Sequence, residues 1–179
     1  MNFQDFIKNH TEKTRHNYIV PGLMSHRLGL HMVRVFENTR KQEFFITPHN
    51  HRFPLMCTVL RGHVVNTLYT AVNVPEKLPA HIRQSFDTYG VFNYDHREGG
   101  INSPCLKKAP FARKSELHRT GATYVMAAEE FHSISFSEDA VVLFLEGENS
   151  PGKSQVLLPV GSEGAYCNTA VTLPWMFRE

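Results

Sequence analysis

Residues 49–62 have the sequence HNHRFPLMCTVLRG, in which two histidines one residue apart precede an apolar run that ends at a glycine. Side chains alternate between faces along an extended chain, so His49 and His51 point the same way, with Leu55 and Cys57 further along that face. Imidazole is a ligand for iron, zinc, copper and nickel. The stretch therefore predicts a strand over residues 54–61 with a pair of metal-ligating histidines at its entrance.

A metal site needs a third ligand, and the best candidate is His132, at the start of the stretch HSISF. A second hairpin would bring this strand opposite the one that follows His51. The prediction is a site made by His49, His51 and His132, which come from two segments far apart in the chain.

The rest of the chain favours an all-β fold. At the N-terminus, Phe3, Phe6, Ile7 and His10 have helical spacing, and the helix is expected to end before Pro21. Short stretches rich in Val, Phe, Tyr and Thr then alternate with turn residues and predict strands at 26–36, 43–47, 54–61, 63–70, 90–95, 117–127, 131–136, 140–146 and 165–173. One helix followed by many short strands predicts a sandwich or barrel.

We expect residues 1–22 to form an N-terminal helix that packs on the barrel and residues 23–179 to form one domain. Within that domain, residues 72–116 are rich in proline and glycine. They are expected to leave the barrel as a long loop, a lid or an edge hairpin, with a short helix over 78–86.

Composition limits the possible partners. The 179 residues include 19 Lys and Arg against 17 Asp and Glu, a formal charge of +2, which argues against nucleic acid as a partner. The three cysteines, Cys57, Cys105 and Cys167, form no CxxC pair, and no apolar run reaches the ~20 residues that span a bilayer. The expectation is a cytoplasmic protein that binds a small-molecule substrate and does not associate with membranes.

Residues 49–62 resemble the first cupin motif, in which HxH is followed by a glutamate and a glycine. His49 and His51 match the ligands, Gly62 matches the glycine, and Leu55 stands in the place of the glutamate. Gly121 and His132 have the spacing of the second motif, although Ala127, Glu129 and Phe136 replace its usual proline, glycine and asparagine.

The chain is also similar to poorly characterised cupins with the pattern HxHxWDFxSxVLxG, and the match covers about residues 26–147. This resemblance implies a double-stranded β-helix, that is, a jelly-roll barrel, with the N-terminal helix and the inserted loop added to it. It also implies a divalent transition metal and a homodimer.

In its three-histidine site the chain resembles thiol dioxygenases, which implies iron(II), with zinc, nickel and manganese as alternatives. Some of those enzymes carry a cysteine that is cross-linked to a tyrosine. Cys57 is the candidate cysteine, with Tyr166 or Tyr124 as its partner, although a small buried strand residue is the simpler interpretation of Cys57. Tyr124 is a candidate for orienting substrate, unless its ring packs in the core.

Three further residues could assist the site. His118 could be a fourth ligand or support one, and Glu129 or Glu130 could accept a hydrogen bond from the His132 ring. A competing metal triad would combine the HxE at 96–98 with His132.

The functional hypotheses are an iron(II) dioxygenase of a small thiol or anionic substrate, a non-catalytic small-molecule-binding cupin, and a cupin isomerase or epimerase.

Overall fold

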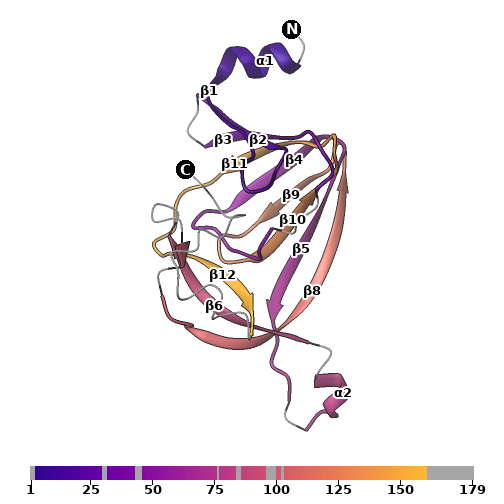
Figure 1. The fold of residues 1–179 in the computed structure, drawn as a ribbon, viewed down its shortest axis with the longest axis vertical. Coiled ribbons are helices and arrows are strands. Elements are labelled where there is room, and N and C mark those ends of the chain that lie inside the picture. Colours follow the sequence, from indigo (N-terminus) through magenta and orange to yellow (C-terminus); the bar gives the residue numbers. More distant parts are fainter. Residues whose placement is uncertain are drawn as a thin grey trace.

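The computed structural model describes residues 3–29, 32–42, 46–75, 77–83, 86–95, 100–101 and 103–160. In these ranges the chain forms two helices and twelve strands (Figure 1). The elements are α1 (Phe3–His10), β1 (Thr11–Arg15), β2 (Leu23–Leu28), β3 (Val33–Asn38), β4 (Leu55–Arg61), β5 (His63–Ala71), α2 (Ala80–Arg83), β6 (Asp87–Asp95), β7 (Gly100–Ile101), β8 (Lys107–Arg119), β9 (Thr123–Met126), β10 (Phe131–Phe136), β11 (Val141–Glu146) and β12 (Ser154–Pro159). No described helix is long and apolar enough to cross a bilayer.

The strands form two antiparallel sheets. The first has the order β1-β2-β3-β11-β4-β9, and the second has the order β10-β5-β8-β6-β12, with β7 paired to β6. His49 forms bridges to His132 on β10 and to Val156 on β12, so its segment lies between these two strands. One sheet thus contains β3, β11, β4 and β9, and the other contains the His49 segment, β10, β5 and β8, which is the strand arrangement of a jelly roll. The predicted all-β jelly-roll class is confirmed.

The main core lies between the sheets and follows from the alternation in β4. Leu55, Cys57 and Val59 are buried, whereas Met56 and Leu60 are exposed. The buried set packs with residues of the other strands in a single apolar cluster, which includes Leu23, Phe36, Val64, Ile134, Val142 and Phe144. The face of β4 that carries this set is the face on which His49 and His51 were expected.

The N-terminal helix is shorter than predicted. It ends at His10, and residues 11–15 form β1, which pairs with β2. The side chain of Ile7 packs with Leu28, Val35 and Val141, which places α1 against the outside of the first sheet. The sequence TEKTR of β1 has no apolar side chains, so its cross-strand hydrogen bonds to β2 give it strand structure without a periodic pattern.

The inserted stretch 72–116 contains more strand than expected. It contains α2, β6, β7 and the first part of β8, and β6 pairs with both β8 and β12. Phe92 and Tyr94 of β6 pack with Val156 and Leu158 of β12 in a second apolar cluster. The excursion therefore extends the second sheet, in which β6 lies between β8 and β12.

Candidate metal centre

The backbone holds the three predicted histidines together. The amides of His49 and His132 each donate a hydrogen bond to the other residue's carbonyl, both at 2.9 Å, and the amide of His51 donates to the carbonyl of Ala128 at 3.0 Å. These bonds fix the HxH segment against β10 before any side chain is considered. The jelly-roll pairing therefore brings together residues that are 81 positions apart in the chain.

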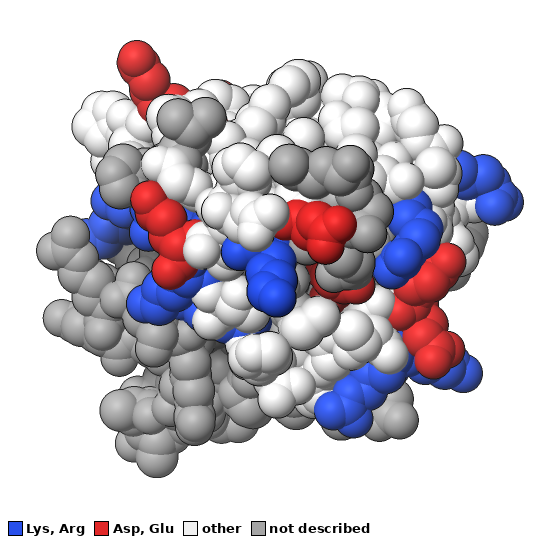
Figure 2. All heavy atoms as spheres, turned by 90° about the horizontal axis from the view of Figure 1, so that it is seen from above, with Lys and Arg blue, Asp and Glu red and all other residues white. Residues whose placement is uncertain are grey.

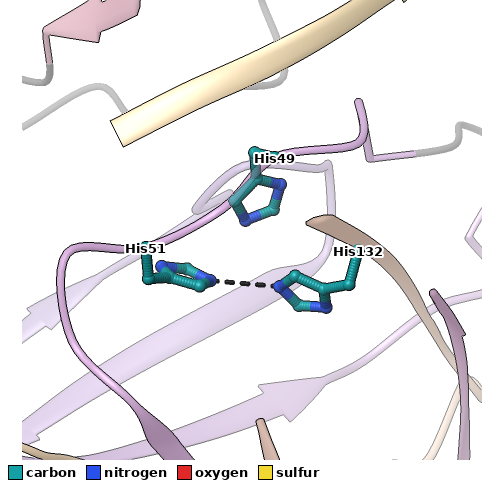
Figure 3. A group of neighbouring side chains, drawn as sticks. All are labelled: His49, His51 and His132. Atoms are coloured by element: carbon teal, nitrogen blue, oxygen red, sulfur yellow. Dashed lines mark hydrogen bonds between the residues drawn. The ribbon is translucent and has the colours of Figure 1, made fainter. Parts of the chain in front are cut away.

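The three imidazoles converge on one point (Figure 3). One ring nitrogen from each of His49, His51 and His132 lies within 4.8 Å of the other two, and Nε2 of His51 is 3.0 Å from Nε2 of His132. The ring of His49 lies edge-on to that of His51, with centroids 4.8 Å apart. The convergence predicted from the sequence is present in the fold.

Two of the rings are oriented by hydrogen bonds on their far side. Nδ1 of His49 donates to the carbonyl of Thr47 at 2.8 Å, and Nδ1 of His132 donates to Oδ1 of Asn66 at 2.8 Å. With the proton on Nδ1, the Nε2 lone pair is left to face the shared point. Ligating histidines in metalloproteins are oriented in this way.

The group that orients His132 is not the one suggested by the sequence. Asn66 lies on β5 and is only 2% exposed. Glu129 is exposed, and the Glu130 carboxylate accepts a hydrogen bond from the Ala127 amide at 2.6 Å. Asn66 lies opposite Ile134 in the β5–β10 register, two residues from His132 along β10, so only knowledge of the strand pairing could have revealed it.

Burial keeps His132 neutral. Its side chain is 2% exposed, and burial, followed by the proximity of His49, lowers the pKa of His132 well below its ordinary value of 6.5. A neutral imidazole is the form that binds a metal ion. The site therefore offers its lone pairs at neutral pH without first losing a proton from this ring.

The three histidines line a cavity of about 290 Å³. The wall of this cavity is largely apolar and includes Phe36, Phe53, Leu55, Ile134 and Phe144. Its charged lining consists of four arginines and one carboxylate, namely Arg15, Arg27, Arg34, Arg52 and Glu146. A cavity of this kind suits a small, partly apolar molecule that carries negative charge.

A strained turn forms part of the cavity wall. Ile19 has φ +68° and Asn17 has φ +53°, and Tyr18, which lies between them, lines the cavity together with Ile19. Positive φ is a genuine outlier for a β-branched residue and costs about 1–3 kcal/mol. The hydroxyl of Tyr18 accepts a hydrogen bond from Nη1 of Arg34 at 3.4 Å, which ties the turn to the charged part of the lining.

The residues present fit a metal ion. Two nitrogens bound at about 2.1 Å to one ion lie roughly 3.0–3.4 Å apart, depending on the bond angle. The 3.0 Å separation of His51 from His132 already falls in this range. The ring nitrogen of His49, up to 4.8 Å from the others, needs to approach by roughly 1.4–1.8 Å to match it. Within the described residues no carboxylate joins the group, in keeping with Leu55 at the glutamate position of the motif.

The pair His49 and His51, which precedes β4, and His132 on β10 lie close together inside a jelly roll. The protein has a cupin fold. No family model and no curated protein sequence matches the chain. Its structure is similar to that of Drosophila melanogaster CENP-C bound to CAL1, with a TM-score of 0.44 and 10% identity over 80% of this chain and 92% of the other.

Two further solved structures are similar at comparable levels. The Drosophila melanogaster CENP-C cupin domain has a TM-score of 0.43 and 11% identity over 75% of this chain and 74% of its own. The hydroxypropylphosphonic acid epoxidase from S. wedmorenis has a TM-score of 0.41 and 11% identity, covering 77% of this chain and 56% of the epoxidase. Such distant similarity gives no information on activity, and function has to be argued from the site.

The two residues predicted to be catalytic lie deeper in the cupin barrel. Cys57 on β4 and Tyr124 on β9 are paired in register, and both pack in the main core. Neither is among the residues that line the cavity. The structure thus brings Cys57 and Tyr124 together but does not bring them to the three histidines.

The environment of this pair suppresses ionisation. Burial raises the pKa of the Cys57 thiol to about 12, and burial followed by the nearby Cys57 raises the pKa of Tyr124. The ring of His118 stacks on that of Tyr124 at 4.0 Å, so His118 contacts this pair and is not part of the histidine group. A catalytic role for Cys57 and Tyr124 stays a prediction. Tyr166 and the HxE at 96–98 lie outside the described residues.

Proposed function

We propose that this cupin is a mononuclear metal-dependent oxygenase, specifically an iron(II) dioxygenase that acts on a small anionic or thiol substrate. The observation that carries the proposal is the convergence of three imidazole nitrogens within 4.8 Å in the lining of a cavity. The far-side hydrogen bonds of His49 and His132 support it, because they fix both rings in the ligating orientation.

The type of ligand supports a redox-active transition metal. Imidazole suits iron, copper, nickel and zinc, whereas magnesium and calcium prefer oxygen ligands. A bound iron(II) ion would supply Lewis acidity and the one-electron chemistry that dioxygen requires. Three imidazole ligands would hold such an ion without cancelling its charge, which would attract an anionic group of the substrate.

The protein's own residues have two further tasks in this proposal. The apolar wall, with Phe53 and Leu55 next to the HxH pair, limits the water around the reacting atoms, which strengthens electrostatic interactions there. Asn66 holds the His132 ring through the hydrogen bond to its Nδ1. Both arrangements position substrate and ligands before reaction, which lowers the entropic part of the barrier.

The test compares metal content and oxygen uptake in three proteins. Wild-type protein, His51→Ala and His63→Ala are purified identically, the last as a control because His63 is an exposed histidine on β5. We expect one iron per chain in the wild type and in the control and a loss of iron in His51→Ala, together with oxygen uptake when 3-mercaptopropionate or cysteamine is added.

Other outcomes would favour the alternatives. Stoichiometric metal without oxygen uptake on any member of a thiol and carboxylic acid panel contradicts the oxygenase and favours an isomerase or a metal-containing binding protein. Equal metal content in wild type and His51→Ala contradicts the site itself.

A further inference from the structure

Three arginines follow one another across the inner face of the first sheet. Arg27 on β2 lies directly opposite Arg34 on β3 in the strand register. Arg15 on β1 lies opposite Ser25, which is two residues before Arg27 and therefore on the same face. All three arginines line the same cavity as the histidines. We call Arg15, Arg27 and Arg34 the arginine row.

This placement is unfavourable for folding alone. Like charges directly opposite each other on an antiparallel pair are destabilising. The Arg34 side chain is 22% exposed, so water screens it only in part. Next to the row, the inner face carries the large apolar side chains of Leu23, Phe36 and Phe144. Two opposed guanidinium groups add no stability to a sheet face that packs against a core.

One carboxylate compensates part of this charge. Nε of Arg34 is 2.5 Å from Oε1 of Glu146, whose side chain is 15% exposed. Burial raises the pKa of Glu146, while the positive charges of Arg34 and Arg27 lower it. Among the described residues, Glu146 is the only acidic one that lines the cavity. Among the described residues that line the cavity, the arginine row and Arg52 thus contribute four positive charges against the one negative charge of Glu146.

The outer surface does not share this imbalance. On the face seen in Figure 2, basic and acidic side chains are interspersed. The whole chain carries 19 basic and 17 acidic residues, a net of +2, whereas the described cavity lining carries four arginines and one glutamate. The positive charge is thus concentrated at a cavity wall, where a ligand can use it.

We propose that the arginine row binds the anionic head group of an organic acid, namely a carboxylate, phosphonate or sulfonate on a short apolar chain. Guanidinium groups match such oxyanions with paired hydrogen bonds. The apolar side chains that line the same cavity contact the chain, and a cavity of about 290 Å³ restricts the ligand to a small molecule. The assignment of the reacting end to the histidines rests on the proposed function, whereas head-group binding does not need the metal.

The test measures binding to the metal-free protein by calorimetry. The probes are butyrate, butylphosphonate and butanesulfonate, with butanol as a neutral control of similar length. We expect the strongest of the three anions to bind at least about tenfold more tightly than butanol, because each hydrogen bond between charged groups is worth roughly a factor of ten or more. The order of the three anions identifies the head group.

Two variants locate the binding. Arg27→Gln is expected to weaken the anion by about tenfold to a hundredfold. Arg119→Gln, at an exposed arginine outside the cavity lining, is expected to leave it unchanged. Thermal unfolding shows whether Arg27→Gln folds, and Arg15→Gln replaces it if it does not. Equal affinities for anions and butanol, or equal losses in the cavity variant and in Arg119→Gln, would overturn the proposal.

The failure of this inference is separable from the failure of the proposed function. His51→Ala is expected to lose metal but to keep its affinity for butylphosphonate in metal-free buffer. Anion binding in a protein that never acquires metal would leave the arginine row intact and contradict only the oxygenase.

Discussion

Replacing Asn66 by leucine tests whether the hydrogen bond behind His132 prepares that ring for a metal ion. Asn66 is 2% exposed, and its Oδ1 accepts the bond from Nδ1 of His132 at 2.8 Å. Leucine has a similar size but accepts no hydrogen bond, so Asn66→Leu leaves a buried N–H without a partner. His132 is then free to rotate or to move its proton to Nε2, the atom that must face the ion.

The expected effect follows from the geometry. Loss of a partner that orients a ligating histidine lowers metal affinity by about tenfold to a hundredfold, which corresponds to roughly 1.4–2.8 kcal/mol. The unpaired N–H also lowers the free energy of unfolding by about 1–3 kcal/mol. The affinity is measured by competition between the protein and a chromogenic chelator for zinc(II) or cobalt(II) at pH 7.5, at a temperature where all variants are folded.

Asn38→Leu is the matched control. Asn38 is 1% exposed, and its Nδ2 donates hydrogen bonds to the carbonyls of Arg40 and Ser137 at 2.7 and 2.8 Å, away from the histidines. Both variants lose hydrogen bonds of a buried asparagine, and only Asn66→Leu should lose metal affinity. If the two variants bind the metal equally well, within about twofold, Asn66 does not orient a ligand and the reasoning fails.

Three further predictions concern stability. Burial lowers the pKa of His132 and of His26 below 6.5, so the unfolded chain binds more protons than the folded protein as the pH falls. The metal-free protein should therefore be most stable above about pH 7 and lose stability as the pH falls through 6.5. Urea unfolding midpoints at pH 7.5 and 5.5 measure this loss. In chemical denaturation, Gly62→Ala should be more destabilising than Gly121→Ala. Both glycines have positive φ (+70° and +88°), but only at Gly62 would a Cβ lie 2.5 Å from another side chain. Equal losses of unfolding free energy in the two variants would contradict this. Phe92→Ala, at a fully buried site in the second cluster, should lower the free energy of unfolding by about 3–5 kcal/mol, and a loss below 1 kcal/mol would show that the cluster between β6 and β12 is not a packed core.

Strand β4 could be predicted from the sequence because one of its faces is exposed to solvent. The alternation of buried and exposed residues in β4 fixed its position within one residue of the predicted 54–61. Strand β12 was not predicted, because Val156, Leu157 and Leu158 are all buried and give no alternation. Strand β1 was missed for the opposite reason, since TEKTR is polar throughout.

The three histidines of the site could be predicted, because imidazole is a metal ligand and because their spacing along the sequence is informative. The two-residue spacing of His49 and His51 gave their common direction, and the glycine-to-histidine spacing selected His132. Asn66 and the pair of Arg27 with Arg34 were not predictable, because each depends on the register between strands and not on any local pattern. Register follows from the packing of the whole barrel, so interactions of this kind emerge only with the fold.

The position of Glu146 explains how the cavity can hold both a metal and an anion. Glu146 lies directly opposite Leu55, the residue that stands in the place of the cupin ligand glutamate, and both line the cavity. Its carboxylate is bound to Arg34, however, and does not belong to the histidine group. The carboxylate nearest in register to the site thus offsets an arginine and leaves a bound divalent ion with its full charge. Because a bound metal and the arginines would then attract the same negative ligand within one cavity, an acid that reaches both should bind more tightly to the metal-loaded protein, whereas one too short to reach both should bind equally to both forms.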